Sequence, residues 1–402
     1  MALVGSGFMA MLADTDAGSV ITAAQSGAKY RYALVLPQLL IPVLYLIQEL
    51  TVRLGLSTRL GHRALIRQIF GRRWALLAAV TLFVSCIGAL VTEFAVVAGV
   101  GTLVGIPRWS STGAAALALI TLVLLGRYRR VEHVGIAVGT LELLFLPAVL
   151  LAHPHVSMVL HDFVHPPHAS AAFVTLLGAN VGAVIMPWMV FYQQEAVIDK
   201  GQRGLNLRSA VRSARLDTAF GAVMTQIVMI AVVVASAATL GVTRGQALNG
   251  IGDIANSLTP FLGHRDAVIF FGLGMIGASV VAALVVILAG AWGISEVLGW
   301  RHSLNDSPIR TTGFYALAVG GAVAGAVLVL LAPSLVNLSV DVEVMNASLL
   351  PIVLGFLLAL ERRALPPELR IRGTRRALTY ALTNLVIIFG LFTAAMIIRG
   401  II

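Results

Sequence analysis

The stretch Asp14-Thr15-Asp16-Ala17-Gly18-Ser19 places two carboxylates and a helix-weakening glycine inside an apolar segment. Apolar residues flank it from Ala2 to Ala13 and from Val20 to Ala28. Carboxylates are costly to hold at membrane depth, and they mark functional sites there by default. Broken backbone at that depth is tolerated only where it is buried in protein or lines a cavity. The pairing of acids with a broken helix therefore predicts a cation site.

The composition is that of a polytopic membrane protein. Hydrophobic residues make up 58% of the 402 residues and charged residues only 11%, whereas a soluble domain has roughly 25% charged residues. The mean hydropathy is +0.93. The net charge of +10 does not indicate nucleic-acid binding, because the arginines fall in short loops between apolar spans. The single cysteine, Cys86, lies in an apolar span, which excludes an internal disulfide.

Eleven apolar spans are expected, each near the roughly 20 residues that cross a bilayer. Basic loops follow the second, fourth, sixth, eighth and tenth spans, and the intervening loops carry few basic residues. This alternation predicts a cytoplasmic N-terminus and an external C-terminus in a plasma or inner membrane. The expected spans are residues 4–28, 33–54, 74–104, 112–126, 133–152, 171–198, 217–241, 267–298, 313–332, 343–361 and 376–398.

The sixth span repeats the irregularity of the first. It contains Gly178, Gly182 and Pro187, and proline removes a backbone donor and clashes with the preceding turn. A simple proline kink is one interpretation. Interrupted helices five spans apart, however, point to an inverted-repeat transporter with a midplane binding site. The divisions would be 1–152 for the first repeat, 153–170 for an external His-rich loop, 171–361 for the second repeat, and 362–402 for a cytoplasmic basic loop and the eleventh helix.

Four motifs, in order along the chain, resemble the Nramp family of metal transporters. Asp16-Ala-Gly-Ser and the following Gln25-Ser-Gly-Ala-Lys-Tyr resemble the family's first-helix Asp-Pro-Gly-Asn signature and its tail. Ala183-Val-Ile-Met-Pro resembles the sixth-helix Ala-x-x-Met-Pro. Gln48 with Leu54-Gly55, and Thr92-Glu93-Phe94, resemble patterns of the second and third helices. The resemblance runs from about Ala13 to Gln194. It implies an all-α membrane protein with a LeuT-like 5+5 inverted repeat, broken helices 1 and 6, and one extra helix.

The resemblance also implies a metal site at four positions. Asp16 would supply carboxylate oxygen, and Ser19 stands where the family has a coordinating Asn. Ala183 would offer a backbone carbonyl and Met186 a thioether. Oxygen ligands suit Mg²⁺ and Mn²⁺, while a thioether adds preference for softer transition metals. Ordinary apolar filling is the alternative role for Met186.

Departures from the family pattern bear on proton coupling. Trp188 and Gln193 replace two sixth-helix histidines of the family, and Leu90 replaces a third-helix Asp. An indole does not exchange a proton near neutral pH, and Leu carries none. Of the family's proton path only Glu93 remains, so we expect weak or absent proton coupling.

Polar positions in the first and tenth spans extend the candidate site. Asp14 has no acidic counterpart in the family pattern. Pointing inward, it adds a hard oxygen that favours Mg²⁺; pointing outward, it caps the second half-helix. In the tenth span, Asp341 and Glu343 are expected at the outer mouth. Asn346 lies deeper, where its oxygen or a bound water would complete the ion's shell.

Two further groups fall outside this site. Glu296, near the inner end of the eighth span, is expected to interact with neighbouring arginines. His-rich tracts can bind metal, but the loop between spans five and six has no rigid ligand spacing, and its prolines suggest an extended connector. Its histidines are His153, His155, His161, His165 and His168.

We predict a transporter that moves divalent metal ions of the Mn²⁺/Fe²⁺ class into the cytoplasm by alternating access. The alternatives are a Mg²⁺ transporter, a non-transporting membrane metal receptor, and an organic-cation transporter in which Trp188 stacks on the substrate. Enzyme motifs such as Gly-x-Ser-x-Gly, a phosphate loop or His-Glu-x-x-His are absent from the sequence. The expected partners are the transported ion and the lipid bilayer, with no other cofactor and no nucleic acid; the sequence leaves the oligomeric state open.

Overall fold

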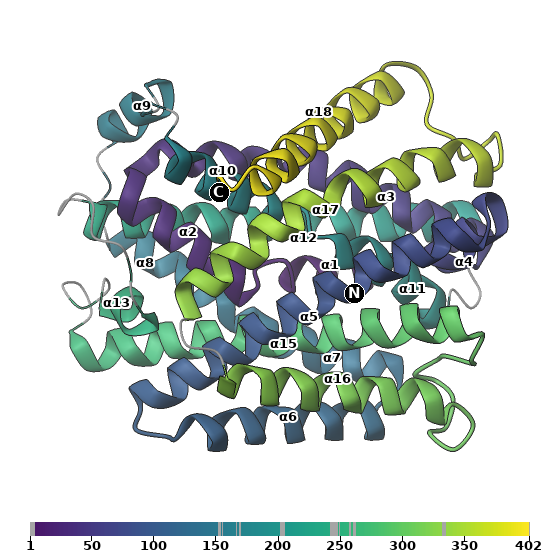
Figure 1. The fold of residues 1–402 in the computed structure, drawn as a ribbon, viewed down its shortest axis with the longest axis horizontal. Coiled ribbons are helices and arrows are strands. Elements are labelled where there is room, and N and C mark those ends of the chain that lie inside the picture. Colours follow the sequence, from purple (N-terminus) through teal and green to yellow (C-terminus); the bar gives the residue numbers. More distant parts are fainter. Residues whose placement is uncertain are drawn as a thin grey trace.

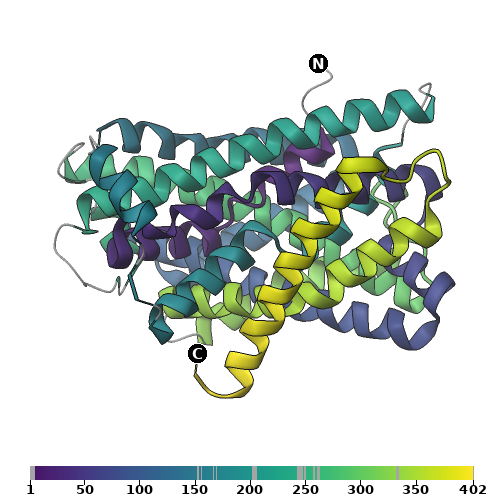
Figure 2. The ribbon, with the colours of Figure 1, turned by 90° about the horizontal axis from the view of Figure 1, so that it is seen from above.

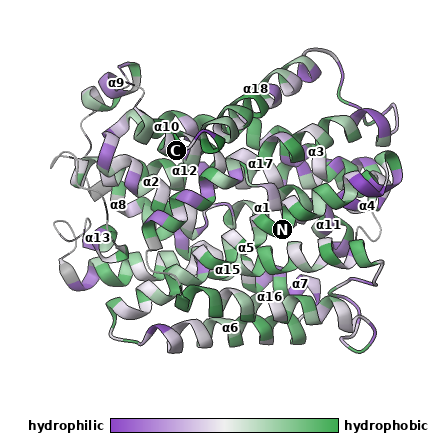
Figure 3. Ribbon diagram, in the orientation of Figure 1, coloured by the Kyte–Doolittle hydropathy of each residue, from purple (hydrophilic) through white to green (hydrophobic). Residues whose placement is uncertain are grey.

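The computed structural model describes residues 5–151, 154, 156–165, 167–168, 170–201, 206–241, 248, 250–256, 259, 263–331 and 335–401. Within these ranges every regular element is a helix, and there is no strand. The long helices run roughly side by side in one bundle, as the two views at right angles show (Figures 1 and 2). Hydrophilic residues gather toward the ends of the bundle, notably at α4 and α9, while its middle is largely hydrophobic (Figure 3).

Most of the long helices coincide with predicted spans. The elements are α1 Ser6–Leu12, α2 Ala17–Tyr30, η1 Arg31–Leu39, α3 Ile41–Thr58, α4 His62–Phe70, α5 Arg72–Leu103, α6 Arg108–Leu125, α7 Tyr128–Gly139, η2 Thr140–Leu144, α8 Phe145–Leu151, α9 Val156–Val164, α10 Ala171–Val184, α11 Pro187–Lys200, α12 Leu207–Thr239, α13 Ile251–Asn256, α15 His264–Leu298, α16 Thr312–Leu331, α17 Leu335–Ala364 and α18 Gly373–Ile398.

Eight helices in the described ranges are long and apolar enough to cross a membrane, counting α10 with α11 as one. A ninth candidate is the pair formed by α2 with η1 and by α3, bent by 41°. The predicted first span is divided into α1 and α2, and the predicted fifth into α7, η2 and α8, so neither provides one long helix. The total of eleven crossings stays a prediction.

The connector between the fifth and sixth spans differs from the expected extended chain, because it contains α9. Its helix is held to the start of η1 by an ion pair of 3.2 Å between Arg31 and Asp162. His161 and His165 stack on each other there, with ring centroids 4.9 Å apart. His153 and His155 lie outside the described residues.

Close contacts between helices place the two broken segments. The Asp217 carboxylate of α12 accepts hydrogen bonds from the backbone N–H groups of Gly5, Gly7 and Phe8, at 2.8 to 3.1 Å, and so holds the start of α1. In α10, a Cβ at Gly182 would lie 1.9 Å from the carbonyl oxygen of Glu343 in α17. Only glycine allows backbones to approach this closely.

Candidate metal site

The two helix breaks meet inside the bundle. The first separates α1 from α2 at residues 13–16, and the second separates α10 from α11 at Ile185 and Met186. The Ser19 hydroxyl donates a hydrogen bond of 3.3 Å to the carbonyl oxygen of Ala183. Both residues are buried. Two of the predicted ligand positions therefore lie in contact, although they are far apart in the sequence.

Asp16 uses its two oxygens differently. It is the N-cap of α2, and its Oδ1 accepts a hydrogen bond of 2.7 Å from the Ser19 N–H. Its Oδ2 is buried and accepts no hydrogen bond from a conventional donor in the described part of the chain, while the Glu93 carboxyl lies beside the Asp16 carboxylate. The cap holds the carboxylate in place while leaving one oxygen available to a cation.

Asp14 is buried, with 1% of its surface exposed. Its Oδ2 accepts a hydrogen bond of 3.4 Å from the Gln226 side chain in α12, and its Oδ1 is unpartnered among the described residues. The neighbouring Thr15 hydroxyl bonds to that of Thr225, also in α12. The outward, helix-capping interpretation of Asp14 is wrong, because Asp16 provides that cap.

Glu343 is the main residue whose predicted position, at the outer mouth of the tenth span, is wrong. It is fully buried rather than at the outer mouth, and a Cβ at Gly18 would lie 2.4 Å from its Oε1. Its Oε2 accepts a hydrogen bond of 3.1 Å from Asn346, whose Oδ1 accepts one of 2.8 Å from Ser85. The spacing of Glu343 and Asn346, three residues apart on one helix face, was the signal available in the sequence.

Glu93 is a further buried acid beside the first break. Its Oε2 accepts a hydrogen bond of 3.3 Å from the Ala17 N–H, and its Oε1 makes no hydrogen bond of good geometry among the described residues, although the Ser279 side chain lies beside the carboxylate. Asp16 lies close enough to Glu93 and Glu343 for their charges to repel one another, and Asp14 likewise lies close to Asp16. None of the ion pairs found in the described ranges involves these four acids.

A fifth buried acid, Glu142, lies near Asp14 on the short helix η2. The Thr15 side chain lies beside its carboxylate, but neither oxygen makes a hydrogen bond of good geometry in the described chain. Buried carboxylates without partners are strongly unfavourable unless a cation or protons neutralise them. The sequence could have indicated Glu142, because it is an acid within the predicted fifth span, but it was not among the predicted site residues.

The second break carries Met186 at the N-cap of α11, with its side chain fully buried. Trp188 follows, also buried, and its indole N–H has no partner in the described chain. The Gln193 amide donates a hydrogen bond of 3.3 Å to Thr218 of α12. The side chains of Trp188 and Gln193 therefore face the core, and neither titrates near neutral pH.

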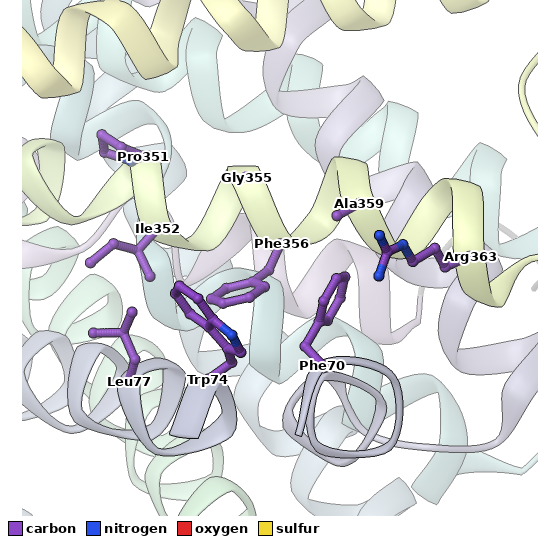
Figure 4. Close-up of a pocket in the computed structure, with 9 residues that line it drawn as sticks. All are labelled: Phe70, Trp74, Leu77, Pro351, Ile352, Gly355, Phe356, Ala359 and Arg363. Carbon is purple, nitrogen blue, oxygen red and sulfur yellow. The ribbon is translucent and has the colours of Figure 1, made fainter. Parts of the chain in front are cut away.

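A groove of about 420 Å³ lies apart from the acids, between α17 and the α4–α5 segment (Figure 4). Phe70, Trp74 and Phe356 form much of its wall, and Arg363 stands at one end. No carboxylate lines it. Because divalent cations bind oxygen ligands of negative charge, this groove is not a candidate for the ion.

Comparison with known proteins identifies the family. The model described as "Natural resistance-associated macrophage protein-like" (Nramp) matches residues 7–396. The chain belongs to the Nramp family. Membership was predicted from motifs that end near Gln194, and the family match extends to nearly the whole length of this Nramp protein.

Two bacterial relatives of this Nramp protein are named divalent metal cation transporter MntH. The protein of Erwinia tasmaniensis is 27% identical over 303 residues, which cover 72% of this chain and 71% of the relative. That of Acidiphilium cryptum is 27% identical over 339 residues, covering 79% and 75%.

Solved structures confirm the predicted LeuT-like fold. A manganese transporter of Eremococcus coleocola, bound to an aromatic bis-isothiourea compound, superimposes with a TM-score of 0.77 at 16% identity, covering 98% of this chain and 86% of the other. A Na⁺-coupled sialic acid symporter gives 0.63 at 13% identity, covering 97% and 89%. MhsT in complex with L-phenylalanine gives 0.60 at 13% identity, covering 96% and 97%. At these identities the likeness concerns the fold alone.

Proposed function

We propose that this Nramp protein transports divalent metal ions of the Mn²⁺/Fe²⁺ class into the cytoplasm by alternating access. The observation that best supports this proposal is the group of buried carboxylates where the two helix breaks meet, each with an oxygen that makes no hydrogen bond of good geometry among the described residues. The names of the MntH relatives and of the manganese transporter support a divalent metal as the substrate. They also support a transporter rather than an enzyme.

The proposed ligands come from both breaks. Asp16 offers its free Oδ2, Ala183 its carbonyl and Met186 its thioether, while Ser19 and Asp14 supply further oxygens. A dication balances the charge of two of the surrounding carboxylates and so removes the penalty of burying them unpaired. The thioether favours Mn²⁺, Fe²⁺ or Cd²⁺ over Mg²⁺ and Ca²⁺. Asn346 would act through Glu343, to which it is hydrogen-bonded.

Alternating access would use the broken helices as moving parts. Four-residue and two-residue breaks allow α1 and α11 to tilt while α2 and α10 stay joined through Ser19 and Ala183. Movement of the inner half-helices would open the site toward one side of the membrane, as in other inverted-repeat transporters. The arginine-rich ends of the helices would face the cytoplasm, with the N-terminus inside and the C-terminus outside.

A Mg²⁺ transporter is the second candidate, and the position of Glu343 favours it. Its Oε1 beside Gly18 adds a hard, charged oxygen to those of Asp14 and Asp16. Hard oxygen ligands of this kind suit Mg²⁺. A non-transporting receptor is the third candidate, and a measured metal flux would rule it out.

Uptake into proteoliposomes tests the proposal. The purified full chain would be assayed with Mn²⁺, Fe²⁺, Cd²⁺, Mg²⁺ and Ca²⁺, beside Asp16→Asn and the matched control Asp341→Asn, an exposed acid on α17. Asp16→Asn keeps an oxygen for the α2 cap but removes the charge that faces the ion. We expect Mn²⁺ uptake to fall by at least about 100-fold, or about 2.8 kcal/mol, with the control near wild type. Undiminished Mn²⁺ uptake by Asp16→Asn would overturn the assignment.

A further inference from the structure

A second group of metal-binding side chains lies away from the helix breaks. Glu195 of α11, Glu296 at the end of α15 and His302 in the loop that follows each offer one ligand atom, and these atoms all lie within 4.8 Å of one another. In the part of the chain that the structure describes, no other group of three such residues is found. The sequence suggested only that Glu296 contacts arginines, and Arg63 does lie 3.7 Å from it.

The two glutamates point at one small space beside Gly61. A Cβ at Gly61 would lie 1.6 Å from Oε1 of Glu195 and 2.1 Å from Oε1 of Glu296. Both side chains are more than nine-tenths buried, with exposed fractions of 6% and 8%. Oε1 of Glu195 accepts no hydrogen bond from a conventional donor among the described residues, and the Glu296 carboxyl lies beside the Glu195 carboxyl. Two carboxylate oxygens held this close require a cation or a proton between them.

His302 is oriented as a ligand. Its Nδ1 lies 2.9 Å from the carbonyl oxygen of Trp300. Because a carbonyl can only accept, Nδ1 carries the proton, and the lone pair is left on Nε2. A hydrogen bond of this kind fixes the tautomer and the ring orientation of metal-binding histidines.

The loop that carries His302 is fastened to α11. Asp199, one turn beyond Glu195, accepts hydrogen bonds from the Ser303 hydroxyl, from the Leu304 N–H at 2.9 Å and from the Asn305 amide at 3.3 Å. The loop that carries His302 is therefore held against α11 by contacts that do not depend on an ion.

The charges of the surrounding groups favour binding of a dication. Arg63 lies beside Glu195 and Glu296, and Asp199 is a third carboxylate close to Glu195. Burial lowers the pKa of the neighbouring His62 to about 4, and the hydrogen bond to Gln194 opposes this only in part, so His62 is neutral at pH 7. If all three carboxylates are ionised, as they would be around a bound cation, their charge exceeds that of Arg63 by two.

We propose that Glu195, Glu296 and His302 form a second site for a divalent transition-metal ion. Two carboxylates with one imidazole suit Mn²⁺, Fe²⁺, Co²⁺ or Zn²⁺, whereas Mg²⁺ and Ca²⁺ prefer oxygen ligands alone. The site lies at the end of the molecule that holds α4 and the α15–α16 connection, on the right in Figure 1. An ion there joins the inner half of the broken sixth span to α15.

Metal counting on the purified full chain tests this site separately from transport. Zn²⁺ binding would be measured by calorimetry and Mn²⁺ binding by electron paramagnetic resonance. The variants are Glu195→Gln, which keeps the side-chain shape, and His302→Ala, which alters a partly exposed loop residue. Glu132→Gln is the matched control, because Glu132 is another buried acid, paired with Lys200 at 2.9 Å.

We expect each cluster variant to bind one Zn²⁺ fewer than wild type, or to bind it at least about tenfold more weakly, while Glu132→Gln binds like wild type. Asp16→Asn should retain this ion, so its binding does not depend on the transport site. Equal Zn²⁺ stoichiometry and affinity in wild type and His302→Ala would overturn the proposal and indicate that a shared proton bridges the glutamates. If Glu195→Gln fails to fold, His302→Ala decides the question alone.

Discussion

Asp16 shows how one residue serves both the fold and the site. Its Oδ1 accepts the Ser19 N–H, a cap that typically stabilises a helix by about 1 kcal/mol. Its Oδ2 is buried and accepts no hydrogen bond from a conventional donor in the described chain. The chemistry of the site therefore depends on which oxygen of each acid is already hydrogen-bonded. Asp14, Glu93 and Glu343 likewise each have one hydrogen-bonded oxygen and one that makes no such bond in the described chain.

Met186→Ala is expected to change selectivity at the proposed transport site. Mn²⁺ and Cd²⁺ uptake should fall at least about tenfold, and Mg²⁺ or Ca²⁺ uptake much less, because only the softer ions gain from sulfur. Uptake of the four ions into liposomes measures this. Met189→Ala is the control, since Met189 is equally buried on α11 and its loss leaves a similar cavity. An equal loss for all four ions would show that the thioether is not a ligand.

Glu343→Gln tests whether the Glu343 carboxylate contributes a hard oxygen ligand to the site. The substitution keeps the shape of the side chain and removes the charge beside Gly18. We expect Mg²⁺ uptake to fall at least about tenfold and Mn²⁺ uptake to fall less, because Mn²⁺ retains the thioether. Competition between Mg²⁺ and radioactive Mn²⁺ gives the ratio, and Asp341→Asn serves as the control. An unchanged ratio would place Glu343 outside the ion's shell.

At the scale of elements, glycines set how closely the broken helices approach their neighbours. The contact of α10 with α17 at Gly182 brings the Ala183 carbonyl and Glu343 to the same region. On α2, a Cβ at Gly27 would lie 2.3 Å from the carbonyl oxygen of Val233 in α12. These contacts position the ligands more directly than the apolar faces of the helices do.

Gly182→Ala should therefore separate α10 from α17 and disturb the site. We expect at least about tenfold lower Mn²⁺ uptake and a lower unfolding temperature. The control is Gly178→Ala on the same helix, where the added Cβ would meet Thr393 at 3.5 Å, an ordinary contact. That variant should transport within about twofold of wild type and gain up to about 1 kcal/mol in helix propensity. Similar behaviour of the two variants would refute the role given to the close approach.

At the scale of the whole molecule, charges are divided between two regions. The acids around the helix breaks have no basic partner among the described residues, whereas Glu49 accepts three guanidinium groups. These are Arg53 at 2.6 Å, Arg215 of α12 at 2.9 Å and Arg375 of α18 at 3.0 Å. The network ties three helices together, whereas the acids in the middle of the bundle are left for a cation or protons to neutralise.

Metal movement is expected to be weakly coupled or uncoupled to protons, because Trp188, Gln193 and Leu90 carry no group that titrates near neutral pH. A dication crossing alone carries two charges, so about 4.6 kcal/mol per 100 mV acts on it. Metal uptake into liposomes should rise steeply with an inside-negative potential, and an internal pH dye should show little acidification. Acidification near one proton per ion, lost in Glu93→Gln, would instead show that the clustered acids form a proton route.

The sequence by itself determined the elements and the family. Apolar runs, basic loops, and Asp, Gly and Pro inside two spans are local signals, and they predicted most of the long helices, both breaks and the Nramp resemblance. The helix α9 was not predicted, because the prolines around it suggested an extended chain. The family match and the structural likenesses bear out this level of the prediction.

Only the tertiary structure decided which distant side chains meet. Glu343 faces Gly18 from 325 residues away, and Glu195, Glu296 and His302 converge from α11, α15 and a loop. These meetings depend on the rotation of each helix about its axis and on where glycines let backbones touch. Both are set by the packing of the whole bundle, because each helix adopts the orientation that buries its own face against several neighbours at once.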